Sequence, residues 1–286
     1  MLAAALALAG ALVWGGADFL GGVAARRMHA VRVTLFAGLG SVVLLVPAQL
    51  LVPGTWSPHD LLWGAVSGAF YVVGLLALYA ALATGPMVIL SPLAAVISAV
   101  VPAGWAFVAE GELLGPIAWA GAACAVAAVV LIARARGEHA TRPKARPLAL
   151  AVASGVGFGA FLIALDRTGD DAGLTPLVAN RAVLVGVCAI VIGALALRRG
   201  RDDESDGTPA TGVRLAVATG LCDAVANALI LTALRSGELS VVSVLQALYP
   251  AGTVLLAALV LRERLAPPQW AGLALALTAG ALFALG

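Results

Sequence analysis

The feature that most constrains this chain is an internal duplication. The stretch Leu261–Leu285 reads LRERLAPPQWAGLALALTAGALFAL, which is a short charged turn, two prolines, a tryptophan and an apolar run. The same order of residues occurs 151 positions earlier in the chain. The matched residues are Glu112, Leu114, Pro116, Trp119 and Gly121 in the first copy, and Glu263, Leu265, Pro267, Trp270 and Gly272 in the second. Self-similarity at a fixed period indicates one structural unit built twice.

Upstream of this motif the two copies match at a spacing of 152 residues. Each copy passes from a pair of apolar segments, through an acidic turn, into one more apolar segment. The glutamate of each turn stands beside a predicted helix start, where a carboxylate favours the positive end of the helix dipole. We therefore expect Glu112 and Glu263 to serve folding. The upstream matches are Ala81, Leu82 and Gly85 with Ala233, Leu234 and Gly237.

The composition indicates a chain built for lipid. Hydrophobic residues make up 62% and charged residues 11% of the 286 residues, whereas about a quarter of the residues in a soluble domain are charged. A helix that crosses a bilayer core of about 30 Å needs about 20 apolar residues. The sequence predicts an all-α membrane protein with ten such spans: Leu2–Val23, Val31–Val52, Leu61–Ala83, Met87–Val108, Pro116–Ile132, Pro147–Leu165, Leu174–Leu197, Val213–Leu234, Ser240–Leu261 and Pro268–Leu285.

Two polar stretches interrupt the apolar pattern. Residues 135–146 form a basic linker between a first repeat, residues 1–134, and a second repeat, residues 147–286. Residues 198–212 are polar and rich in turn formers, which predicts a mobile loop. Because the basic residues flank apolar spans, they favour anchoring at a membrane surface over nucleic-acid binding.

The predicted number of spans in each repeat has a geometric consequence. With five spans per repeat, an odd number, the second copy enters the membrane from the opposite side, so the two repeats are inverted. Inverted repeats are the architecture of many secondary transporters, whose solute site lies near the membrane midplane between the repeats.

The repeated motifs resemble the EamA-type family of the drug/metabolite transporter superfamily. The motifs are Ala-Leu followed by Gly, a helix with a central proline, and Glu-x-Leu followed by Pro, Trp and Gly, together with Trp14-Gly15 in the first span. The resemblance covers essentially the whole chain and implies ten helices around a central cavity that carries small metabolites, often outward. These motifs are structural and say little about the solute. The chain departs from the family in Pro53–Asp60, where it has no Lys or Arg.

Ionisable residues inside a span are expensive and normally face the bundle interior, a partner or water. Asp18 lies one turn after Trp14 on the same face of the first span. We expect Trp14 and Asp18 to bind solute. The alternative is that Asp18, near the end of its span, pairs with Arg26 or Arg27.

A second polar face lies on the eighth span, where Asp223 and Asn227 are one turn apart. At a spacing of 152 the residue that matches Asp223 is Tyr71 of the third span, and Tyr79 continues the Tyr71 stripe. These four residues are predicted to line a shared solute cavity. The alternative is an interhelical hydrogen-bond pair. From the sequence alone, Asp223→Asn is expected to keep the fold and to lose transport.

Two further candidates lie on the ninth span, whose Gln246 and Tyr249 are large enough to reach a solute. Small polar residues there and on the fourth span, including Ser91 and Ser98, favour close helix packing. Arg181 of the seventh span has two interpretations. Its long stem could snorkel to the membrane surface, or it could pair with an intramembrane aspartate such as Asp18 or Asp223 and take part in coupling.

The remaining patterns limit the function classes. His29, His59 and His139 lie in predicted loops, and Cys124, Cys188 and Cys222 lie in apolar runs without metal-ligand spacing. No catalytic set, metal site or cofactor is therefore expected. No glycine-rich phosphate loop precedes a lysine. The sequence predicts a secondary transporter that exports a small polar metabolite, such as an amino acid or an amine-bearing solute, with protons as a candidate coupling ion. The alternatives are an importer or facilitator and, from another class, a membrane scaffold or membrane-embedded enzyme.

The distribution of basic residues predicts the orientation in the cell membrane. Loops that follow odd-numbered spans hold fourteen Lys and Arg residues, against two, Arg167 and Arg235, on the other side. The positive-inside rule places the fourteen in the cytoplasm, so both termini are predicted to face outward. The family resemblance implies the reverse, because its members are usually described with cytoplasmic termini.

Overall fold

A computed structural model of the chain describes residues 1–52, 54–85, 87–111, 115–134, 145–199, 209–252 and 267–285. In these residues all regular structure is helical, which confirms the all-α prediction. The helices are α1 (Leu2–Ala25), α2 (Ala30–Ala48), α3 (Pro58–Thr84), α4 (Met87–Trp105), the π-helix η1 (Ala106–Glu110), α5 (Pro116–Arg134), α6 (Ala145–Asp166), α7 (Thr175–Arg199), α8 (Ala210–Leu234), α9 (Leu239–Gln246) and α11 (Pro267–Leu285).

Six helices of the described residues, α1, α2, α3, α6, α7 and α8, are long and apolar enough to cross a membrane. The shorter apolar helices lie within residues 93–109, 119–128 and 239–252. Ten spans therefore stay a prediction. The acidic turns at Glu112 and Glu263, and most of the predicted linker and polar loop, lie outside the described residues.

Local chemistry explains several helix ends. The Ser57 hydroxyl accepts the backbone N–H of Asp60 at 3.0 Å, and Pro58 occupies the first turn of α3. Both features are typical of helix starts. At its other end α3 stops at Thr84, one residue before Gly85, where the sequence predicts a break.

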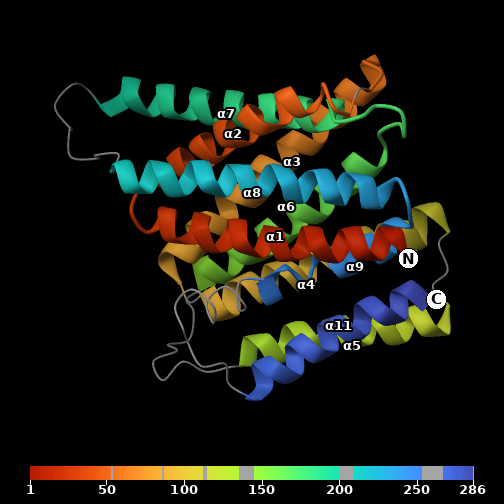
Figure 1. Cartoon of the computed structure of the whole chain (residues 1–286). Helices are drawn as coiled ribbons and strands as arrows, with labels where there is room; N and C mark the ends of the chain where they lie inside the picture. The colour runs from red at the N-terminus through yellow and green to blue at the C-terminus, as the bar shows by residue number, and fades with distance from the viewer. Residues whose placement is uncertain are drawn as a thin grey trace.

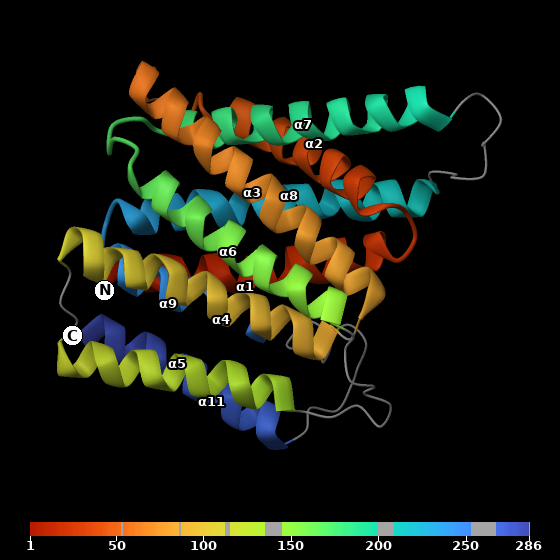
Figure 2. The same ribbon diagram turned by 180° about the vertical axis from the view of Figure 1, so that it is seen from behind.

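The helices run side by side, and the two repeats are interleaved (Figures 1 and 2). The most extensive contacts join α1 to α8 and α3 to α6, and α5 packs along α11. Exchanging each helix for its counterpart in the other repeat turns the α1–α8 contact into the α6–α3 contact. The packing therefore follows a pseudo-twofold relation between the repeats.

Glycines allow this close packing at equivalent places. A Cβ atom at Gly68 of α3 would lie 2.5 Å from the carbonyl oxygen of Asn180 on α7. At Gly220 of α8, 152 residues later, a Cβ would collide with the carbonyl group of Ala37 on α2. Small residues at such interfaces let helix backbones approach in membranes.

Loops join the two repeats at one end of the bundle. At the end that also holds the N-terminus and the end of α11 (Figure 1), the Arg235 guanidinium donates to the carbonyl oxygen of Gly173 at 2.7 Å. The Thr55 N–H donates to the Asp171 carbonyl oxygen at 2.9 Å. Burial lowers the pKa of the Arg235 guanidinium, and the carboxylates of Asp170, Asp60 and Asp171 act in the opposite direction.

The predicted span Ser240–Leu261 is helical in its described part, but the helix is interrupted after Gln246. Helix α9 ends at Gln246, residues 247–248 form a turn in which Leu248 N–H donates to the Leu245 oxygen at 3.1 Å, and helical structure resumes at Tyr249, where Ala251 N–H donates to the Leu248 oxygen at 2.9 Å. The physical reason is Pro250, which has no N–H to donate to the carbonyl of Gln246 four residues earlier. Residues 253–261 lie outside the described part of the chain.

Helix α4, the counterpart of α9 in the first repeat, tolerates a proline in its last turns. The helix continues past Pro102 to Trp105, and the π-helix η1 adds the last turn. The predicted span Met87–Val108 thus ends differently from its prediction, because an α-helix gives way to a π-helix before the left-handed Gly111, whose φ is 71°.

Candidate functional site

A buried polar cluster surrounds Asp223 in the middle of α8. The Asp223 carboxylate accepts hydrogen bonds from Trp14 Nε1 at 3.0 Å, from Asn227 Nδ2 at 3.0 Å and from Ser41 Oγ at 3.2 Å. The hydroxyl of Tyr71 also donates to it. With Arg181 these residues form the Asp223 cluster, whose members come from α1, α2, α3, α7 and α8: Trp14, Ser41, Tyr71, Arg181, Asp223 and Asn227.

Arg181 supplies the positive charge of the Asp223 cluster. Its Nη2 lies 3.0 Å from Asp223 Oδ2, and its guanidinium carbon lies 4.4 Å from the centre of the Tyr71 ring. The arginine is 1% exposed, so it does not snorkel. Removing two charges from water is costly, and that cost is offset only when geometry and hydrogen bonding are good. The donors around Asp223 provide such an environment.

The position of this cluster follows from the duplication. Tyr71 and Asp223 are equivalent residues of the two repeats, and they are hydrogen-bonded to each other across 152 positions. A contact between equivalent residues lies on the pseudo-twofold axis. The Asp223 cluster therefore lies where the two repeats meet.

A second polar contact joins α4 to α9 of the other repeat. Gln246 Nε2 donates to Ser98 Oγ at 3.2 Å, and each residue stands four positions before a proline, Pro250 or Pro102. Gln246 Oε1 has no hydrogen-bond partner among the described residues.

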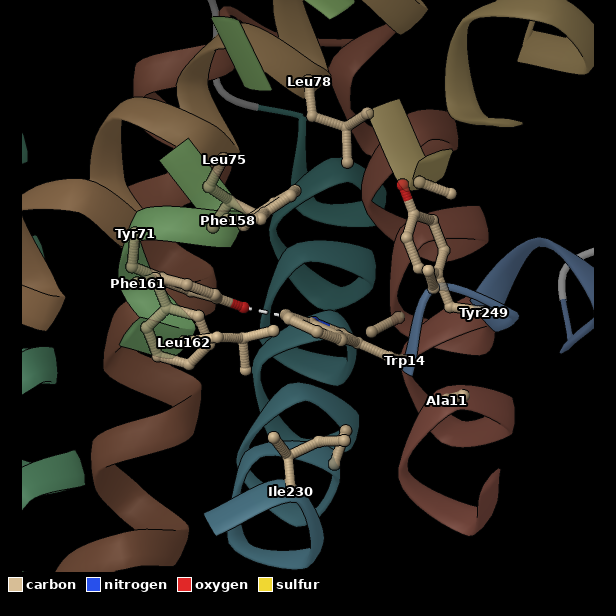
Figure 3. Close-up of a cluster of buried hydrophobic side chains, with 14 of the residues drawn as sticks. Ala11, Trp14, Tyr71, Leu75, Leu78, Phe158, Phe161, Leu162, Ile230 and Tyr249 are labelled. Atoms are coloured by element: carbon tan, nitrogen blue, oxygen red, sulfur yellow. Dashed lines mark hydrogen bonds between the residues drawn. The ribbon is translucent and has the colours of Figure 1, made fainter. Parts of the chain in front are cut away.

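Aromatic rings enclose the Asp223 cluster on the side of α6 (Figure 3). The Trp14 and Tyr71 rings are stacked, with centroids 6.1 Å apart and planes 10° apart. Phe158 and Phe161 of α6 pack against both rings, and Tyr249 lies 6.1 Å from Trp14. Figure 3 shows Trp14 between Tyr71 and Tyr249.

Asp18 lies one turn beyond Trp14 on α1 and is 5% exposed. No hydrogen bond from the described part of the chain reaches its carboxylate. The charged side chain that acts on it is Asp223, which repels it. Arg26 and Arg27 are exposed, and neither pairs with Asp18.

Two tyrosines complete the surroundings of Asp18. The Tyr79 ring fills the space beside Gly21 of α1, where a Cβ would lie 2.6 Å from ring carbons. Tyr249 donates its hydroxyl hydrogen to the carbonyl oxygen of Ser91 at 3.1 Å. Both tyrosines interact electrostatically with Asp18.

The sequence-predicted residues thus fall into two neighbouring groups. Trp14, Tyr71, Asp223, Asn227 and Arg181 meet in the Asp223 cluster, whereas Tyr79 and Tyr249 surround Asp18, and Gln246 bonds to Ser98. Sequence reasoning missed Ser41, Phe158 and Phe161. A lone hydroxyl in the second span was the available signal for Ser41, and nothing in the sequence distinguished the two phenylalanines from packing residues.

A separate apolar cavity of about 400 Å³ lies between α4, α5 and α9. It reaches from Val96 of α4 to Phe107 of η1, and Trp119 of α5 and Val244 of α9 also line it. Ala99 and Ala247, which follow Ser98 and Gln246 in sequence, form part of its wall. The cavity therefore borders the Ser98–Gln246 hydrogen bond and lies apart from the Asp223 cluster.

Comparisons with known proteins give the family and the fold. Among the described residues, no group of three or more His, Cys, Asp and Glu side chains could hold a metal ion. A search of curated proteins finds no match to the chain. A solved structure described only as "Crystal structure of protein" is similar over 99% of this chain and 96% of its own, at 18% sequence identity and a TM-score of 0.76, and this likeness shows the fold.

The family comparison covers both repeats. The model of the EamA-like transporter family matches residues 1–134 and again residues 145–285. The chain belongs to the EamA-like transporter family and is a multi-pass membrane transporter, not an enzyme.

Proposed function

We propose that the chain is a secondary transporter that exports a small polar metabolite, an amino acid or another amine-bearing or cationic solute, by alternating access between its inverted repeats. The observation that carries this proposal is the Asp223 cluster, a buried arrangement of charge and hydrogen bonds at the pseudo-twofold axis. Intramembrane ionisable groups are rare and usually mark solute or ion pathways.

Unused hydrogen-bonding capacity supports a solute site at this place. Asn227 Oδ1, Gln246 Oε1 and Arg181 Nε are buried and have no hydrogen-bond partner among the described residues. Each such group costs about 1–3 kcal/mol, and a polar solute could recover part of that cost. The binding residues that we propose are Trp14, Asp18, Tyr71, Tyr79, Asp223, Asn227, Gln246 and Tyr249, with Arg181, Asp18 and Asp223 as candidates for coupling.

The places of Asp18 and the apolar cavity support a route through the protein. Asp18 is seven residues from the end of α1 at Ala25, or about 10 Å at a rise of 1.5 Å per residue. The cavity lies toward the opposite end of the bundle, beside the last turn of α4. Solute would move from the Asp18 side, past the Ser98–Gln246 pair, toward the cavity.

A difference between equivalent helices supports alternating access. Helix α4 continues through Pro102, whereas α9 ends four residues before Pro250. A rocking mechanism requires two repeats of similar sequence to adopt different backbone conformations. Each repeat then takes the other's conformation when the transporter opens to the opposite side of the membrane.

The proposed orientation follows the basic residues. Fourteen Lys and Arg residues in predicted loops of one side against two opposite favour outward-facing termini in the plasma membrane. Alkaline phosphatase fused to the C-terminus should then be active in cells. An inactive phosphatase fusion beside a fluorescent GFP fusion would contradict this orientation.

Counterflow in liposomes tests the function. Purified protein, reconstituted with a panel of amino acids and small amines inside the vesicles, should accelerate uptake of the matching labelled solute over protein-free vesicles. The double variant Asp223→Asn/Arg181→Gln, which removes both charges together, is the matched control and should lose this uptake. No counterflow with any panel member would favour a membrane scaffold. Equal rates in both directions under opposite gradients would indicate a facilitator.

A further inference from the structure

The buried charges near the pseudo-twofold axis do not balance. Asp223 is paired with Arg181 at 3.0 Å, and it also accepts hydrogen bonds from Trp14, Ser41, Tyr71 and Asn227. Asp18 is a second buried acid beside it and repels it. The three ionisable groups therefore carry one negative charge in excess when both acids are ionised.

No helix packed against Asp18 supplies the missing positive charge in the described residues. The described groups that act on Asp18 electrostatically, or on which it acts, are Asp223 of α8, Tyr79 of α3 and Tyr249 after α9. Arg181, on α7, acts instead on the two α3 tyrosines, Tyr71 and Tyr79. An uncompensated carboxylate at this burial is strongly unfavourable in a membrane.

The surroundings of Asp18 suit a cationic group. The Tyr79 ring lies beside Gly21, and the Tyr249 ring lies 6.1 Å from Trp14, so the two rings pack against α1 within about one turn on either side of Asp18. Each tyrosine is less than 3% exposed. Aromatic faces attract ammonium groups, more strongly where water is excluded. The hydroxyl hydrogen of Tyr249 is already donated to the Ser91 carbonyl, so it does not satisfy Asp18.

We propose that Asp18 is the position that binds one unit of positive charge, either a proton or the ammonium group of the solute, while Asp223 stays paired with Arg181. The proposal rests on the transport function above and adds that the two aspartates have different roles. When an ammonium group arrives, the carboxylic acid of Asp18 releases its proton to water and the resulting carboxylate pairs with the ammonium. When the solute leaves, a proton returns. Charge is conserved, and one solute exchanges for one proton.

Infrared spectroscopy tests this inference without any transport assay. The purified protein in nanodiscs is held at about pH 7, where exposed carboxyl groups are ionised, while the C=O stretch of protonated carboxyl groups is followed. The wild type should show such a band, and Asp18→Asn should remove it. Asp18→Glu should keep the band at a shifted frequency, which guards against loss of folding in the first variant. Asp60→Asn is the matched control, because Asp60 is also buried but is hydrogen-bonded to Gly169 N–H at 2.7 Å.

Methylammonium chloride distinguishes the two sources of positive charge. At fixed pH, methylammonium should reduce the wild-type band more than sodium chloride at equal ionic strength does, if Asp18 exchanges its proton for an ammonium group. A band that methylammonium leaves unchanged, but that Asp18→Asn removes, would assign the position to protons alone. A band that survives Asp18→Asn unchanged would overturn the proposal. Absent counterflow would count against the proposed function and leave the infrared result standing.

Discussion

Two buried aspartates on adjacent helices have opposite environments. Asp223 of α8 is surrounded by hydrogen-bond donors from four helices and by one arginine from a fifth. Asp18 of α1, the helix with the most extensive contact to α8, has no hydrogen bond from the described residues. The difference indicates that a compensated acid can hold the repeats together, whereas an uncompensated acid is free to bind a mobile charge.

The largest loss of stability is expected when the ion pair between Asp223 and Arg181 is broken. Arg181→Gln leaves Asp223 buried without a cation, and Asp223→Asn leaves Arg181 buried without an anion. Each single variant should lose about 3 kcal/mol of unfolding free energy, measured by denaturant or thermal unfolding in detergent.

A double-mutant cycle sharpens this prediction. Arg181→Gln combined with Asp223→Asn should be more stable than either single variant, because no unpaired charge remains. Additive losses in the double variant would show that the two residues act independently and would weaken the comparison between the aspartates.

A smaller effect is expected at Tyr71, which donates to Asp223 and accepts from Trp14 Nε1 at 3.1 Å. Tyr71→Phe removes this hydroxyl on the pseudo-twofold axis and should destabilise the protein by about 1–2 kcal/mol. Tyr79→Phe is the matched control, since no hydrogen bond of the Tyr79 hydroxyl to the described chain is found. Equal losses of thermal stability in both variants would argue against a special role for the axis contact.

The smallest effect is expected at Ser41, which donates to the Gly220 carbonyl oxygen at 2.8 Å and to Asp223 at 3.2 Å. Ser41→Ala should cost about 0.6 kcal/mol, which is the average for such bonds in membranes. Ser154, whose buried hydroxyl has no partner among the described residues, provides the comparison, and Ser154→Ala should not destabilise. A larger loss at Ser154 than at Ser41 would contradict the assignment.

Much of the fold could be predicted from the sequence because apolar length and internal repetition report directly on membrane helices and on the family. The match between Tyr71 and Asp223 at 152 positions also indicated that their helices are equivalent. In the structure these two equivalent residues are hydrogen-bonded to each other on the pseudo-twofold axis.

The remaining features of the fold and of the candidate site depend on side-chain packing, which the sequence pattern does not reveal. Pro102 and Pro250 occur in counterpart segments of the two repeats, yet only α9 stops before its proline. The distance of 3.0 Å from Arg181 to Asp223 changes an expectation drawn from the sequence alone, that Asp223→Asn keeps the fold. The lack of partners at Asp18 depends on which side chains surround it, and no spacing reveals that.

The comparison between the two acids is tested most directly by thermal unfolding of Asp18→Asn and Asp223→Asn in the same detergent. The account predicts that Asp18→Asn melts at or above the wild-type temperature, because the amide keeps the shape of the carboxyl group and cannot become an uncompensated buried charge. It predicts that Asp223→Asn melts below the wild type, because Arg181 loses its partner. An Asp18→Asn variant that is destabilised as much as Asp223→Asn would contradict the account, since both acids would then be structural.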